Sequence, residues 1–241
     1  PTILWGLSEE NTTISGEGYK TSTRFMVKSD IYAINITGYN STTLINHVYL
    51  KNLKIKAEVG VSSTKPAIFL KFVGGSKFEN IAIDKMGYGF YAVTPSVPNL
   101  ISQCIFETVS LFQIVKSGLV LQDSYDCRLS NVYVLDLAGS YLSSEAGIKT
   151  IHSYGGDVID SCLVLNGAGH GVTISESATW TTLSNVVSDN NDGHQIYLSY
   201  SSGTQLSNSW ASTSQGANTC GIIVDASNDT IINNCQVRTN A

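Results

Sequence analysis

One short segment recurs eight times along this chain and constrains the fold more than any other feature. Each copy has an apolar or aromatic residue, a variable residue, an Asn-like residue and a short strand-like run, as in "LKNLKI" at 50–55 and "LSNVYV" at 129–134. Successive Asn-like residues are 23 to 30 residues apart, and they are Asn52, Asn80, Gln103, Asn131, Ser161, Asn185, Asn208 and Asn234. Self-similarity at such a period predicts a solenoid.

A second strand signal follows each Asn-like residue at a similar offset, usually led by Gly. Examples are "GVTIS" at 171–175 and "GIIVD" at 221–225. Each repeat therefore reads as strand, Gly-containing turn, strand and loop. Because one such unit can bury its apolar side only against its neighbours, we expect coils stacked along an axis, with parallel strands ~4.8 Å apart.

The Asn-like row has a structural interpretation in this arrangement. Sharp bends between strands leave backbone groups unpaired, and a stacked row of carboxamides could bond to these groups and to the same side chain one coil away. We therefore predict that the row lies inside the bends, with Gln103 and Ser161 as polar substitutes.

Composition narrows the class of protein. The 241 residues are 42% hydrophobic and 14% charged, with a net charge of −5, which is typical of a turn-rich all-β chain and unfavourable for nucleic-acid binding. No stretch approaches 18 consecutive apolar residues, so no membrane span is expected. Five cysteines without CxxC spacing do not suggest zinc, and no cofactor is predicted. Asn-x-Ser/Thr sequences beginning at Asn11, Asn35, Asn40 and Asn228 are compatible with an extracellular surface.

The repeat and the opening "TISGEGYKTSTRF" at 13–25 resemble the pectin-lyase-like family of right-handed parallel β-helices. Similar chains serve as secreted polysaccharide lyases and hydrolases and as viral tailspikes. The resemblance covers residues 12–241 and implies an all-β fold, a single-stranded right-handed parallel β-helix of about eight or nine coils. We expect one domain over 1–241, with irregular opening coils at 1–46 and regular coils at 47–241. The last coil stops after one strand without a cap, so we expect either that the native chain is longer or that another chain covers this end.

A Gly-His-Gly at 169–171 resembles a motif of the polygalacturonases in this family. Their other motifs, Asn-Thr-Asp and Asp-Asp upstream and Arg-Ile-Lys downstream, are missing here. The repeat offers a structural alternative, in which His170 and His194 are neighbours in a row of side chains at the start of the second strands. That row is Tyr88, Ser117, Ala146, His170, His194 and Cys220. We favour the structural interpretation and keep His170 as a catalytic candidate.

Further catalytic candidates come from positions two and four after each Asn-like residue, which should point outward. There Asp84 and Glu107 would lie on adjacent coils, near the ~5–5.5 Å carboxyl separation of a retaining glycosidase. Lys56, one coil earlier, makes a salt-bridged ladder the favoured interpretation. Asp189, Asp192 and His194 form a second polar group in "SDNNDGH", which resembles a Ca²⁺-binding run in composition, although we predict no metal.

The same outward positions carry an apolar stripe, which is unusual for the exposed surface of a soluble monomer. It suggests a covered surface: a partner subunit, with a homotrimer favoured, a loop folded over the groove, or an aromatic platform for sugar rings. The stripe residues are Ile105, Tyr133, Leu135, Leu163, Leu165, Val187 and Trp210.

Two classes of function follow. The favoured one is an extracellular or virion-surface β-helix rod of a tailspike-like or fibre-like attachment protein, with a host polysaccharide or glycan as its partner. The alternative is a polysaccharide lyase or glycoside hydrolase acting in the groove of the β-helix. The missing constellations and the apolar stripe favour the first, and we expect no strong depolymerase activity.

Overall fold

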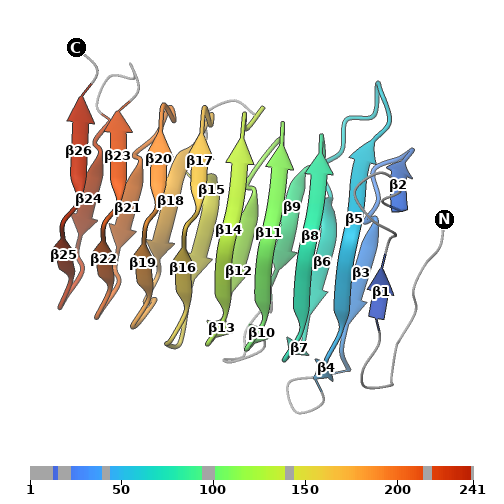
Figure 1. Ribbon diagram of the computed structural model, residues 1–241, viewed down its shortest axis with the longest axis horizontal. Helices are drawn as coiled ribbons and strands as arrows, with labels where there is room; N and C mark the ends of the chain where they lie inside the picture. Colours follow the sequence, from blue (N-terminus) through green and yellow to red (C-terminus); the bar gives the residue numbers. More distant parts are fainter. Residues whose placement is uncertain are drawn as a thin grey trace.

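The computed structural model of the chain describes residues 13–15, 23–39, 44–93, 101–138, 144–213 and 219–239. All regular secondary structure in these ranges is β, and the strands stack along one long axis (Figure 1). Every strand pairing between them is parallel. No helix in the described ranges has the length and apolar character that crossing a bilayer requires.

The first sheet has fourteen strands at nine successive levels. Four of these levels hold one long strand, and each of the last four holds two short ones. The strands are β1 (Thr13–Ser15), β2 (Thr23–Val27), β5 (Tyr49–Ala57), β8 (Lys77–Asp84), β11 (Ile105–Phe112), β14 (Arg128–Leu135), β16 (Val158–Asp160), β17 (Leu163–Leu165), β19 (Thr182–Ser184), β20 (Val187–Asp189), β22 (Gln205–Ser207), β23 (Trp210–Thr213), β25 (Ile231–Asn233) and β26 (Gln236–Thr239).

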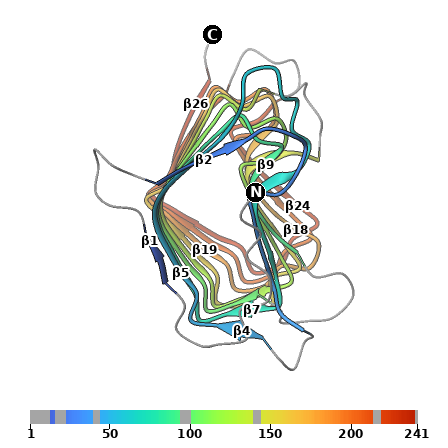
Figure 2. The same cartoon turned by 90° about the vertical axis from the view of Figure 1, so that its right-hand side faces the viewer.

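The second sheet has eight strands and a third sheet has four. The second comprises β3 (Ile34–Thr37), β6 (Pro66–Lys71), β9 (Tyr88–Ala92), β12 (Leu119–Gln122), β15 (Ala146–Ile151), β18 (His170–Ser175), β21 (Ile196–Ser199) and β24 (Ile222–Asp225). The third comprises β4 (Ile45–Asn46), β7 (Val73–Gly74), β10 (Ile101–Ser102) and β13 (Ser124–Tyr125). Figure 2 looks along the stack and shows the three sheets enclosing one interior.

The coils make about seven complete turns, from the level of Asn52 to that of Asn234. The predicted all-β parallel β-helix is confirmed, with about seven turns where eight or nine coils were expected. The core lies between the sheets, where large apolar side chains such as Phe78, Phe90 and Phe106 are fully buried.

The Asn-like row bends the first sheet into two legs. Asn52, Asn80 and Asn131 have φ of 54°, 52° and 54°, the left-handed region that Asn tolerates better than most residues. At this bend two consecutive residues face outward, as Glu79 and Asn80 do between buried Phe78 and Ile81. The bend therefore explains why each repeat needs an Asn-like residue.

Our placement of this row inside the bends was wrong. Its members are half-buried or exposed, because the left-handed residue turns its side chain away from the interior. The predicted bond to the next coil does form: Asn80 Nδ2 donates to Asn52 Oδ1 at 2.7 Å, and Asn234 Nδ2 to Asn208 Oδ1 at 2.7 Å. The row is a hydrogen-bonded ladder on the outside of a corner.

One member of the row was also misassigned. Glu107 pairs with Glu79 and Val109 with Ile81, so Thr108 lies opposite Asn80, with a φ of 54°. Gln103 lies at a different corner, before β11. Both corners accept a polar residue with positive φ, which allowed the sequence alignment to slip by five residues in this one coil.

Candidate functional site

The outer face of the second leg carries two columns of side chains across adjacent coils. One column runs Tyr133, Leu163, Val187 and Trp210, each in register with the next. The other places Phe112, Leu135 and Leu165 in register. We call these seven residues the apolar band: Phe112, Tyr133, Leu135, Leu163, Leu165, Val187 and Trp210. The parallel register fixes them on one surface, as the sequence predicted for six of them.

The band is open to solvent. Phe112, Tyr133 and Val187 are 36–37% exposed, and the other four are half-buried, Trp210 among them. The prediction for Ile105 was wrong: it lies on the first leg, in register with Lys77 and Arg128. Ser110 occupies the place assigned to Ile105 and Phe112 that assigned to Glu107, because the strand assignment in this coil follows from Thr108 and not from Gln103.

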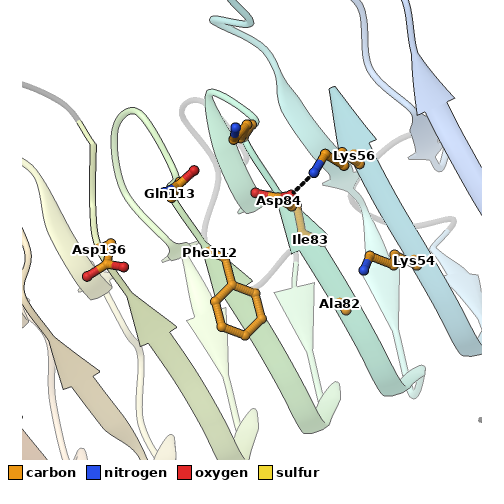
Figure 3. A pocket seen from close by; sticks show the side chains of 9 residues that line it. Lys54, Lys56, Ala82, Ile83, Asp84, Phe112, Gln113 and Asp136 are labelled. Carbon is orange, nitrogen blue, oxygen red and sulfur yellow. Dashed lines mark ion pairs between the residues drawn. The ribbon is translucent and has the colours of Figure 1, made fainter. Parts of the chain in front are cut away.

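A charged depression adjoins the band at its N-terminal end. It has a volume of about 320 Å³, and Figure 3 shows its lining side chains on neighbouring strands of the first sheet. Lys56 Nζ lies 2.7 Å from Asp84 Oδ2, which confirms the salt bridge expected for this pair. The charged and amide side chains of the lining are Lys54, Lys56, Asp84, Lys85, Gln113 and Asp136.

The depression has a net positive lining, with three lysines against two aspartates. Phe112 stands beside these groups and begins the apolar band (Figure 3). A lining that combines an aromatic ring with ammonium groups is suited to hold a ligand that has both an apolar face and a negative or polar edge. The geometry supports binding at this place.

The predicted pair of Asp84 and Glu107 does not form. Asp84 is in register with Phe112, whereas Glu107 is in register with Glu79 on the first leg, beyond the bend. Lys77 Nζ lies 2.8 Å from Oε2 of both Glu79 and Glu107. Hydrogen bonding to these carboxylates raises the pKa of Lys77, and bonds from Lys77 and Tyr49 lower the pKa of Glu79. Glu107 therefore belongs to a surface charge network.

His170 and His194 stack as the repeat predicted, with ring centroids 5.1 Å apart and planes 11° from parallel. His170 Nδ1 accepts the backbone N–H of His194 at 2.9 Å, and His194 Nδ1 accepts that of Cys220 at 3.1 Å. A ring nitrogen that accepts an N–H carries no proton, so both rings are held with the proton on Nε2. Burial also lowers the pKa of His194.

Ser117 has the same role earlier in the row, because its Oγ accepts the N–H of Ala146 at 3.1 Å. The row thus joins coil to coil through side-chain acceptors. In His170 this bond uses the Nδ1 lone pair that a general base would need, which favours the structural interpretation.

Asp189, Asp192 and His194 do not come together in one site. Asp189 faces outward between Leu165 and Ser212, Asp192 is exposed in the following turn, and His194 lies against His170 and Tyr197. Across the described ranges, no three His, Cys, Asp or Glu side chains are grouped to hold a metal. Whether any of the six candidates acts in catalysis stays a prediction.

A second corner ladder flanks the band and was missed in the sequence. It follows the second leg, and all of its members have φ between 48° and 60°. Asn166 Nδ2 donates to Asp136 Oδ1 at 3.3 Å, and Asn190 Nδ2 to Asn166 Oδ1 at 2.8 Å. Its members are Lys85, Gln113, Asp136, Asn166 and Asn190. The recurrence of a polar residue five positions after Asn80, Asn131, Ser161 and Asn185 was the available signal.

Comparison with known families agrees with this architecture. A family model described as right handed beta helix region matches residues 66–237, which is more than two thirds of the chain. This chain belongs to the right-handed β-helix family. A search of curated proteins finds no match.

Solved structures that resemble this right-handed β-helix include three with names that indicate their roles. The siphovirus 9NA tailspike receptor binding domain is 9% identical with a TM-score of 0.59, over 90% of this chain and 46% of that one. The pectate lyase Pel9A is 13% identical with a TM-score of 0.56, over 96% and 68%. The periplasmic alginate epimerase AlgG is 10% identical with a TM-score of 0.53, over 90% and 51%.

These likenesses establish a shared fold and confirm the resemblance to pectin-lyase-like β-helices. The chain spans about half the length of the epimerase and of the tailspike domain. The fold is common to a receptor-binding protein, a lyase and an epimerase, so function has to be argued from the surface of this chain.

Proposed function

We propose that this chain is the β-helix rod of an extracellular or virion-surface attachment protein, which assembles side by side through the apolar band and meets a host glycan. The observation that carries the proposal is the band itself. Leu135, Leu163 and Leu165 form its centre on a flat parallel sheet, where an aromatic sugar platform would have no use for aliphatic side chains.

Burial of the band supports assembly energetically. Covering one large apolar side chain contributes roughly 1.5–3 kcal/mol, and the band repeats such side chains every ~4.8 Å along the axis. Three copies around a common axis would cover three bands together, so a trimer is favoured. The charged depression lies at the N-terminal end of the band and would stay accessible for a glycan with acidic groups.

The test of assembly is light scattering on this chain and on a Leu163→Glu, Leu165→Glu double variant. We expect an oligomer for the first and a monomer for the second. Val59→Glu, at a position that is 88% exposed, is the control for an added charge and should leave the oligomer intact. If the chain and the double variant are both monomers, and Trp210 fluorescence responds to oligosaccharides, the band is a sugar platform and not an assembly surface.

The enzymatic alternative is tested on the same protein. Acidic and neutral polysaccharides are screened for new reducing ends and for unsaturated products, and we expect no strong turnover. Robust turnover abolished by Asp84→Ala, Glu107→Ala or His170→Ala would show instead a polysaccharide lyase or glycosidase.

A further inference from the structure

A row of titratable side chains crosses three coils at the end of the second sheet, away from the apolar band. Asp123, His152 and Glu176 each follow a strand of this sheet and have φ of 55°, 50° and 56°. His152 Nδ1 lies 3.7 Å from Asp123 Oδ1, and its Nε2 lies 3.5 Å from Glu176 Oε2. One imidazole thus stands between two carboxylates.

The environments of the two carboxylates differ. The Asp123 side chain is 6% exposed, and burial raises its pKa against the opposing effects of His152, Gln122 and Tyr154. The Glu176 side chain is 58% exposed. The row therefore presents an anchored acceptor at one end and an accessible one at the other, with a ring that can donate or accept between them.

Exposed aromatic side chains border this row on the same edge. Tyr125 and Tyr154 lie two residues after Asp123 and His152, and they flank the buried Ser124 and Ser153. Tyr125 and Tyr154 are 40% and 45% exposed, so both side chains point outward beside the row. Tyr154 also lowers the pKa of Asp123, which relates the two groups across the coils.

Trp180 is the most exposed aromatic residue near the row, at 66%. Its indole lies over Gly203 one coil away, where an added Cβ would come within 2.8 Å of the ring, and its Cδ1 faces Gly155 on the preceding coil. The ring is thus packed against backbone on one side and open on the other. A large side chain with a φ of 53° is also uncommon, since left-handed backbone disfavours it.

We infer that this edge is a carbohydrate-binding site, separate from the apolar band, that takes a neutral saccharide. We call it the edge patch: Asp123, Tyr125, His152, Tyr154, Glu176 and Trp180. It lies where the second sheet turns toward β13 and the third sheet, along the lower edge of the cross-section in Figure 2.

Both the apolar C–H face and the hydroxyl edge of a sugar ring have matching groups in the edge patch. The C–H face of a pyranose packs on a fixed, preorganised aromatic ring, and Trp180 supplies one without loss of side-chain freedom. The hydroxyls on the ring edge pair with carboxylate and imidazole groups, and hydrogen bonds to charged acceptors are the stronger kind.

Charge selects the class of saccharide. Asp126 is exposed next to Tyr125, so the edge holds Asp123, Asp126 and Glu176 against one imidazole. A uronic acid would meet like charge here, whereas a neutral sugar would not. The lysine-lined depression beside the apolar band has the opposite sign.

The experiment is calorimetric titration with neutral hexasaccharides of glucose, galactose, mannose and xylose, and with an oligogalacturonate for comparison. We expect at least one neutral hexasaccharide to bind more tightly than the oligogalacturonate, and Trp180→Ala to weaken that binding at least tenfold. Tyr39→Ala, which removes an aromatic side chain that is 87% exposed elsewhere, is the matched control and should bind normally.

Two further variants protect the test against a folding defect. His152→Gln and Glu176→Gln should each weaken binding several-fold with an unchanged melting temperature. In a Trp210→Phe background, fluorescence should still respond to the saccharide, and the Leu163→Glu, Leu165→Glu variant should bind as before. No binding by any neutral hexasaccharide, or equal binding by Trp180→Ala and Tyr39→Ala, would overturn the inference whatever the outcome for the apolar band.

Discussion

Two parts of the interior are filled in opposite ways. Between β8 and β12, Phe78 and Phe106 stack with centroids 5.0 Å apart, and Phe90 meets both rings edge-on. Near β20 and β21 another part of the interior holds a polar group centred on Asn191 and Gln195, both fully buried. The first region is held by apolar burial and the second by directed hydrogen bonds.

The polar group satisfies its own members. Asn191 Nδ2 donates to Gln195 Oε1 at 2.7 Å, and Asn191 Oδ1 accepts the N–H of Gly167 at 2.8 Å. Ser188 Oγ donates to the carbonyl of Gln195 at 2.7 Å. The comparison teaches that the coil geometry fixes the backbone register, while different parts of one interior can be held together by packed rings or by hydrogen-bonded amides.

The largest expected effect is in the aromatic region. Phe106→Ala removes a ring packed against two others and should lower the free energy of unfolding by about 3–5 kcal/mol. Chemical denaturation measures it, with Tyr39→Ala, at an exposed position outside the apolar band, as control. A loss below about 1 kcal/mol would mean that the aromatic coils are no better packed than the surface.

The polar region should respond through unmet hydrogen bonds. Asn191→Ala leaves the Gly167 N–H and the Gln195 side chain without their partner, at a cost of about 1–3 kcal/mol. The exposed Gln205→Ala is the control in the same denaturation experiment. Equal stability of the two variants would show that the amide group contributes nothing directional.

A smaller, pH-dependent effect is expected at Asp157. This carboxylate is fully buried and accepts the Ser153 hydroxyl at 2.7 Å and the Cys127 N–H at 2.8 Å. Burial raises its pKa above 3.8, so protonation is favoured in the folded state. The stabilisation of the folded state by protonated Asp157 is therefore fully present below the pKa of the unfolded chain. It is lost as the pH rises through the pKa of the folded state.

Unfolding free energies measured from about pH 3 to pH 7 should show this loss in the present chain and not in Asp157→Asn. Identical pH profiles would indicate that Asp157 has an ordinary pKa.

The smallest effect on stability is expected for the buried hydroxyl of Thr204. Thr204 Oγ1 has no hydrogen-bond partner among the described residues. Thr204→Val replaces the hydroxyl by a methyl of similar shape, which should leave stability unchanged or raise it by up to about 1 kcal/mol. A clear destabilisation in thermal melts would mean that the hydroxyl has a partner, such as buried water.

The repeat predicted the fold because it records where each coil bends. It could not show on which side of the bend Asn52 or Asn80 lies, since a left-handed corner and an internal cap favour the same residue. The slip at Gln103 had a large consequence, because it placed Ile105 and Glu107 on the wrong leg. His170 and His194 were placed correctly, since the strand after them is strongly marked.

The edge patch was beyond sequence reasoning for a different reason. Asp123, His152 and Glu176 come one from each of three coils and share no motif with one another. Their corner has no constant residue type, as Phe72 and Tyr200 occupy it elsewhere. Only the register of the strands brings them together.

The corner ladders also divide the β-helix into coils that each add the same length along its axis. Because each coil carries its own left-handed corners and bonds to the next coil alone, removing residues 161–184 would join two coils that already share the same register. The molecule would become shorter along its axis by one coil, or ~4.8 Å, out of about seven turns. Gain or loss of whole repeats is thus a way for such a chain to change its reach in small, fixed increments without altering its cross-section.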